Sequence, residues 1–212
     1  MIDFDYAVRH LAGVWAMVRG LDNWRDDIDR SMDGVFKSFW ALPMALGPAL
    51  FILAATARGA AGNPEFSQSV VAHAPPALLL IAGAVALVAY WLASIALIVA
   101  FLQRLQATRQ VSDTIIAFNW VQLLTLCVEA IPAGLFAITR GPEVFVTLSL
   151  VAAIFTLYAT WRVLRLAAGV NVSAAIGIIV TLIIVEFVIN ITSMTVVDML
   201  LPKSVGVGVI GS

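Results

Sequence analysis

The sequence predicts an all-α integral membrane protein, in which an N-terminal amphipathic interfacial helix precedes five transmembrane helices. The first observation is composition: 62% of the 212 residues are hydrophobic and 12% are charged, about half the charged fraction of a typical soluble domain. The second is the presence of five apolar stretches, each longer than the roughly 20 helical residues that cross a bilayer.

The positions of the five apolar stretches predict how the chain is organised. They lie at residues 35–57, 77–102, 113–138, 144–166 and 173–201, each bounded by charge, glycine or proline. Alternating strand patterns with turn signals do not recur, so a β-barrel is not expected. We therefore expect a helical segment at 1–34, a transmembrane bundle at 35–201 and a short tail at 202–212.

Basic residues are distributed unevenly between the two sides of the predicted bundle. The N-terminal segment and the second and fourth loops share one side, and they carry Arg9, Arg19, Arg25, Arg30, Lys37, Arg104, Arg109, Arg162 and Arg165. The other side carries Arg58, Arg140 and Lys203. Basic residues favour the cytoplasmic side, so we expect a cytoplasmic N-terminus. The short loops and alanine-rich composition favour the bacterial inner membrane, with the C-terminus in the periplasm.

The first twenty residues carry one apolar helical stripe. It consists of Phe4, Val8, Leu11, Trp15 and Val18, spaced alternately by four and three residues. The segment is too short and polar to span, so it suits a helix in the headgroup plane or one packed on the cytoplasmic face of the bundle. The expected membrane-interface anchors are Phe4, Leu11, Trp15, Trp40, Trp120 and Trp161.

A second helix is predicted after Gly20, running into the first span until Pro43 and Pro48 bend it. Opposite charges four residues apart support this helix; the pairs are Arg25/Asp29, Asp26/Arg30 and Asp33/Lys37. The charged face suits either solvent or a docking partner.

The first span also contains the stretch "FWALPMALGPALF", with Gly47 and Pro48 adjacent. A Gly-Pro near the first of five spans, after a cytoplasmic N-terminal region, resembles the Yip1 family. The resemblance covers this layout and the dipeptide. It implies a non-enzymatic protein of membrane trafficking, membrane shaping or adaptor function.

Polar residues interrupt the third and fifth spans. Asn119, Gln122 and Glu129 share a face of the third, and Asn190 follows Glu186 by one turn in the fifth. Counted from the cytoplasmic ends, the two carboxylates differ in depth by roughly 5 Å. We therefore expect these five residues to form an intramembrane polar cluster.

Three interpretations of this cluster are open. The carboxylates are structural hydrogen-bonding groups between helices, with at least one protonated because an ionised carboxylate is costly in a bilayer. Alternatively, they line a proton or cation path. In the third interpretation, one of them contacts a neighbouring subunit, or a polar lipid or quinone headgroup.

Enzyme signatures are missing from the sequence. It shows no Gly-rich phosphate loop, no Ser/His/Asp set and no helix-borne histidine pair. His10 and His73 lie far apart, and the single cysteine, Cys127, is expected to be buried. We therefore expect no catalytic activity, no metal and no cofactor. The net charge of −1 gives no indication of nucleic-acid binding.

The function expected from the sequence is that of an adaptor, organiser or accessory subunit in a membrane assembly. Its partners would be the lipid bilayer and other membrane proteins or further copies of the chain. The alternative is a small proton- or cation-coupled channel or transporter that uses Glu129 and Glu186.

Overall fold

The computed structural model describes residues 4–61, 63–66 and 68–201, and every regular element among them is a helix. The α-helices are α1 (Phe4–Arg19), α2 (Met32–Ser38), α3 (Ala41–Ala60), α4 (Val70–His73), α5 (Pro76–Arg104), α6 (Val111–Thr139), α7 (Pro142–Leu166) and α8 (Val172–Leu200). Short 3-10 helices occupy Asp22–Arg25, Pro64–Phe66 and Thr108–Gln110. The tail predicted at 202–212 lies outside the described residues.

Five segments are long and apolar enough to cross a membrane, namely α2 with α3, α5, α6, α7 and α8. This confirms the prediction of an all-helical, multi-pass chain, with spans close to the predicted bounds. Local chemistry explains where several begin. Pro76 and Pro142 open α5 and α7, where a missing N–H costs no helical hydrogen bond. Asn171 caps α8 by accepting a hydrogen bond from the Ala174 N–H at 2.8 Å.

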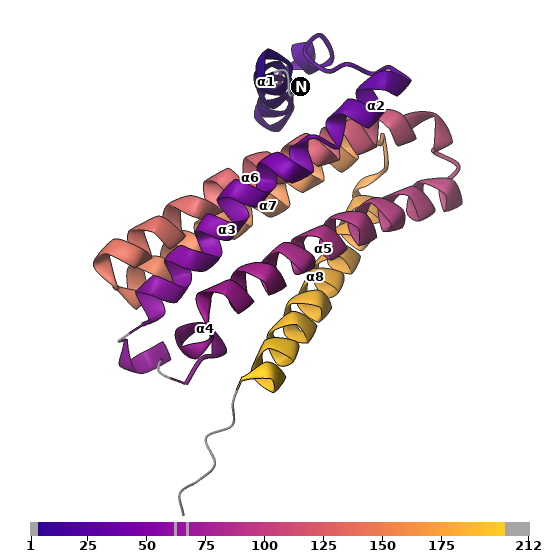
Figure 1. The fold of residues 1–212 in the computed structure, drawn as a ribbon. Coiled ribbons are helices and arrows are strands. Elements are labelled where there is room, and N and C mark those ends of the chain that lie inside the picture. The colour runs from indigo at the N-terminus through magenta and orange to yellow at the C-terminus, as the bar shows by residue number, and fades with distance from the viewer. Residues whose placement is uncertain (1–3, 62, 67, 202–212) are drawn as a thin grey trace, which may run out of the picture.

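The spanning helices form two groups (Figure 1). In one group, α3, α6 and α7 run side by side, and α6 packs against both of the others. In the other, α8 packs mainly on α5, and α5 joins this pair to α3. Helix α1 lies across one end of the first group, where it contacts α6 and α7.

The largest buried side chains gather toward the end of the bundle that carries α1. Trp24, Trp91, Trp120 and Phe118 are all buried there in a single apolar cluster with Met17. A second, smaller cluster of Ala74, Leu79 and Val197 joins α5 and α8 to the segment before α5. Because apolar burial is concentrated near α1, we expect that end to be the more rigid.

Helix α1 packs on the bundle through a face different from the predicted stripe. Ala7, His10, Val14 and Met17 are buried, whereas three stripe residues, Phe4, Val8 and Trp15, remain exposed. Gly20 ends the helix as predicted, with a φ of 79°. The Leu21 N–H donates to the Ala16 carbonyl at 2.9 Å and the Gly20 N–H to the Met17 carbonyl at 3.1 Å, which defines a Schellman motif.

His10 ties α1 to the segment that follows it. Its Nδ1 donates to the Tyr6 carbonyl at 2.7 Å, and its Nε2 accepts from the Asp29 N–H at 2.9 Å. Because a carbonyl only accepts and an amide only donates, these two bonds require the neutral ring. Burial also lowers the pKa of His10 below its ordinary value of 6.5.

The continuous helix predicted after Gly20 is wrong. Residues 26–31 are bends and irregular backbone, and α2 begins at Met32. The cause is the Asp29 carboxylate, which accepts from the Ser31 N–H at 3.1 Å and the Ser31 Oγ at 2.7 Å. Ser31 in turn caps α2 by accepting from the Gly34 N–H at 3.0 Å. These side-chain bonds replace helical ones and set the start of α2.

One of the three predicted charge pairs is present, and Arg25 and Arg30 have other partners. Arg30 pairs with Asp113 of α6 at 2.6 Å, and Arg25 lies 4.4 Å over the ring of Trp24. Asp33 and Lys37 form the predicted pair at 2.5 Å. Of these contacts, the Arg30–Asp113 pair holds the segment to the bundle, because it joins residues distant in sequence.

The helix also breaks earlier than predicted, between α2 and α3. Phe39 and Trp40 lie outside both helices, and α3 starts at Ala41. Pro43 explains this position, because a proline ring clashes with the carbonyl four residues earlier, which belongs to Phe39. Pro48 lies inside α3.

Candidate functional site in the middle of the bundle

Glu129 lies on α6 and is half-buried. The Thr156 hydroxyl of α7 donates a hydrogen bond to its Oε1 at 2.7 Å. Glu129 also lines a cavity of about 180 Å³ between α3, α6 and α7, together with Thr56 and Pro132. This carboxylate therefore has a partner within the chain and also faces an open space.

Glu186 lies on α8, and both it and Asn190 are exposed. They line a second cavity of about 240 Å³ between α3, α5 and α8. Thr56 of α3 and Tyr90 of α5 complete its polar lining, and Thr56 borders the Glu129 cavity too. The two carboxylates therefore face neighbouring cavities that adjoin at α3.

Tyr90 connects the carboxylates to Gln122. It lines the same cavity as Glu186 and Asn190, and its hydroxyl lies next to the Gln122 side chain. The sequence analysis missed Tyr90, although its depth was a usable signal. Tyr90 precedes the end of α5 by 14 residues, and Glu186 follows the start of α8 by 14 residues. Both lie about 21 Å along their helices from the same end of the bundle.

Asn119 belongs to a different group from the carboxylates. Trp91 Nε1 donates to its Oδ1 at 2.8 Å, and its Nδ2 donates to the Ser38 Oγ at 2.8 Å. The Ser38 hydroxyl in turn donates a hydrogen bond to the Val35 carbonyl at 2.7 Å. Ser38 and Asn119 lie toward the end of the bundle that carries α1, and Trp91 reaches Asn119 from the position after Tyr90 on α5. The single cluster predicted from the sequence is thus divided, with Asn119 outside the carboxylate site.

The residues expected to anchor the chain at the membrane interface differ in their exposure. Phe4, Trp15 and Trp40 are exposed, and Leu11 and Trp161 are partly exposed. Trp120 is 0% exposed and stacks near the rings of His10 and Tyr6, at 5.4 and 6.1 Å between centroids. Its expected contact with lipid is therefore wrong, because α1 covers it. The expectation for Cys127 is wrong as well, since this thiol is exposed on α6.

No positive charge faces the carboxylates within the described spans. Arg58, Arg104 and Arg165 lie in the last turns of their helices, and Arg162, one turn before the end of α7, donates to the Met17 carbonyl. The described residues also contain no group of three potential metal ligands. The site is therefore an acidic and hydroxyl-bearing one that lacks a basic partner.

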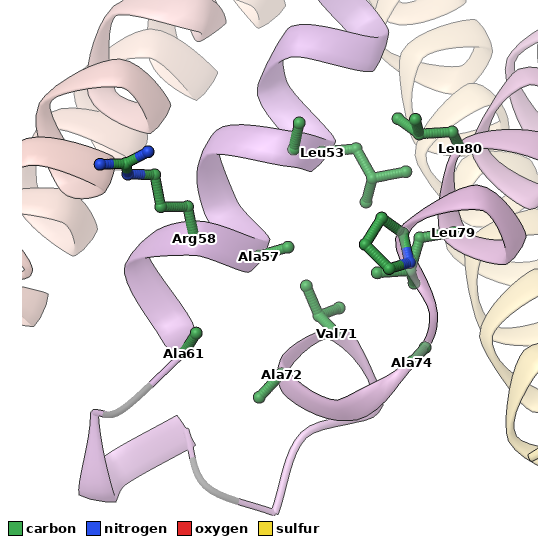
Figure 2. A pocket seen from close by; sticks show the side chains of 11 residues that line it. Leu53, Ala57, Arg58, Ala61, Val71, Ala72, Ala74, Leu79 and Leu80 are labelled. Carbon is green, nitrogen blue, oxygen red and sulfur yellow. The ribbon is translucent and has the colours of Figure 1, made fainter.

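Two further hollows are apolar. A cavity of about 390 Å³ lies among α3, α4 and the start of α5, where Leu53, Val71 and Leu79 converge (Figure 2). The Arg58 guanidinium points away from this space (Figure 2). A groove of about 430 Å³ between α5 and α8 is lined by Val85, Val188 and similar side chains. Both are lined mainly by apolar side chains and suit hydrocarbon chains, whereas the carboxylates line the two cavities described above.

Comparison with known proteins gives no relative. The chain matches no family model, no curated protein and no solved structure. The fold and the site define a helical multi-pass membrane protein with two carboxylates in the middle of its spans.

Proposed function

We propose that this protein is a non-catalytic subunit of a membrane assembly, acting as an adaptor, organiser or accessory chain, and that α8 contacts the rest of the assembly. One observation carries the proposal: Glu186 and Asn190 are exposed in the middle of a membrane-spanning helix. Polar residues at this depth cost several kcal/mol against lipid, roughly 3 kcal/mol for a central charge. A neighbouring protein removes that cost by supplying hydrogen-bond partners.

The proposed orientation places the α1 end of the bundle in the cytoplasm. Arg30 and Arg162 both bond to residues of that end, to Asp113 and to the Met17 carbonyl respectively. This basic end supports a cytoplasmic N-terminus by the positive-inside rule. The exposed Phe4 and Trp15 support α1 resting at the headgroup level while it packs on the bundle. The bacterial inner membrane and a Yip1-like role are parts of the same proposal.

A second candidate is a proton- or cation-coupled pathway through Glu129 and Glu186. The specific observation in its favour is that the two carboxylate cavities adjoin at Ile52 and Thr56. Intramembrane carboxylates next to connected cavities mark such paths in other proteins.

Native mass spectrometry of the protein extracted in native nanodiscs tests the proposal. We expect a complex with another protein or with further copies, and we expect Glu186→Leu to dissociate it. Asp198→Asn is the matched control, because it removes a carboxylate from the exposed outer end of the same helix. A monomer in every preparation contradicts the proposal. Proton flux into liposomes that is lost in both Glu129→Gln and Glu186→Gln then supports the second candidate.

A further inference from the structure

We infer that the partner presents a transmembrane helix with a lysine or arginine near its middle, and that this cation enters the cavity between α3, α5 and α8 to pair with Glu186. The inference rests on the proposed function, because it requires a partner on α8. It adds the chemistry of that partner, which the proposed function leaves open.

Charge complementarity is the first step. Glu129 and Glu186 lie in the interior of their spans, while the arginines of the described spans lie in or within one turn of the helix ends, where Arg162 bonds to the Met17 carbonyl. Ionisable groups inside a membrane are costly when they are left unpaired, and one way to remove that cost is a partner of opposite charge. The described spans offer no such group at this depth, so a cation that pairs with Glu186 comes from outside them.

Glu186 is the better placed of the two carboxylates for an external contact. Glu129 is half-buried and already accepts the Thr156 hydroxyl at 2.7 Å. Glu186 is exposed and belongs to the wall of a cavity that opens between α3, α5 and α8. An incoming side chain therefore reaches Glu186 first, and Glu129 faces the neighbouring cavity.

The lining of the cavity suits an ammonium or guanidinium group. A lysine ammonium has three N–H donors, and the cavity offers three acceptors in Glu186, Asn190 and the Tyr90 hydroxyl. The Tyr90 ring adds a face that attracts cations. Ala86, Leu87 and Ile189 line the rest of the space, where they contact the aliphatic stem of the basic side chain.

Size favours a side chain over a free small molecule. The cavities hold about 240 and 180 Å³, whereas pockets for free ligands usually hold about 300–1,000 Å³. One basic side chain fills the larger cavity, and the helix that carries it stays outside. Ile183 and Phe187 of α8 are exposed beside Glu186 and supply an apolar surface for that helix.

The test uses the full-length protein in liposomes, with a donor fluorophore at its N-terminus and acceptor-labelled peptides. The peptides are Leu/Ala transmembrane helices with Lys, Leu or Glu at the centre, and one with Lys moved two turns away. We expect energy transfer to show about tenfold tighter association for the central-Lys helix than for the central-Leu helix. The Glu helix and the displaced-Lys helix should associate no better than the Leu helix.

Point variants of the protein identify which carboxylate binds the lysine of the peptide. Glu186→Gln should abolish the tenfold preference for Lys, and Glu129→Gln should reduce it less. Asp198→Asn should leave it unchanged, and gel filtration of each variant shows that it is folded. The inference is overturned if the central-Lys and central-Leu helices associate equally well, or if neither helix associates. A complex that native mass spectrometry finds to depend on Glu186 leaves the proposed function intact even then, so the two failures are distinguishable.

Discussion

The two polar regions of this bundle differ in whether the chain completes them. Near α1, Trp91, Asn119 and Ser38 bond to one another, and His10 bonds on both sides of its ring. In the middle of the spans, Glu186 and Asn190 stay exposed. An exception in the first region is Trp120, whose buried N–H has no acceptor among the described residues. The difference shows that the chain satisfies the first region with its own bonds, and it is the basis for our proposal that a partner completes the second.

The largest expected effect separates the two asparagines. Asn119→Leu leaves the Trp91 N–H and the Ser38 hydroxyl buried without their partner, and each lost bond costs about 1–3 kcal/mol. We expect the free energy of unfolding to fall by about 2–4 kcal/mol. Asn190→Leu, on the exposed side of α8, should change it by less than about 0.5 kcal/mol. Denaturation in mixed micelles, followed by tryptophan fluorescence, measures both. Equal losses would remove the distinction between the regions.

Two glycines of α3 compare a tightly packed position with an open one. A Cβ at Gly59 would overlap the Phe136 ring, which stacks on Phe145 at 4.5 Å and cannot move freely. Gly59→Ala should therefore lower stability by about 1–3 kcal/mol. A Cβ at Gly47 meets nothing within 4 Å, so Gly47→Ala should be neutral or stabilise by up to about 1 kcal/mol. Thermal unfolding of the two variants decides, and a loss in Gly47→Ala as large as in Gly59→Ala contradicts this packing.

The stability of the region near α1 should also depend on pH through His10. Burial keeps its pKa below 6.5 when folded, reinforced by Arg9 and opposed by the Tyr6 carbonyl, Asp29 and Asp27. The unfolded chain therefore takes up the proton first as pH falls. The stability from neutral His10 is present above about pH 6.5 and is lost below it, by at most about 1.4 kcal/mol per pH unit.

His10→Gln should remove this dependence of the unfolding free energy on pH, in the range between pH 7 and the lowered pKa of His10 in the folded protein. The low pKa of Asp29, which results mainly from its Ser31 hydrogen bonds, acts in a separate window below its ordinary value of 3.8. Unfolding measured at half-unit pH steps checks the comparison. An unchanged slope in the variant would show that another group titrates.

The smallest expected effect is at the Arg30–Asp113 pair. Its arginine side chain is 48% exposed, so solvent screens the interaction and limits it to about 0.2–1 kcal/mol. Asp113→Asn should lower stability by that amount at low salt, and the loss should shrink in concentrated salt. Asp33→Asn is the control, because its pair with Lys37 lies within one helix and does not join α2 to α6.

The spans were predictable because their length and lack of charge follow directly from the bilayer. The end of α1 at Gly20 was predictable for a similarly local reason, since glycine readily adopts the positive φ found there. The segment after it was not, because Asp29 bonds to Ser31 and to His10, and periodicity does not reveal such contacts.

The site was predictable by residue type and not by arrangement. Glu129, Glu186 and Asn190 stood out as polar groups within apolar stretches. Which of them is exposed depends on how α8 packs on α5, and α8 is apolar on all sides, so its sequence marks no buried face. Trp120 was placed wrongly because α6 contacts α1 as well as α3 and α7, and a contact with such a distant segment leaves no periodic signal in the sequence of α6.

The pairing of α3 with α6 sets a condition on biosynthesis. The most extensive helix contact in the described chain joins these two helices, although α5 lies between them in sequence. The ends of α3 and α6, Ala60 and Thr139, are about 80 residues apart. At about 5–20 residues per second, the ribosome needs roughly 4–16 s to complete α6 after α3 has left the tunnel. During that interval the first span stays in the translocon or beside a membrane chaperone without its main neighbour, so slowing translation in this stretch should raise its exposure to quality-control proteases.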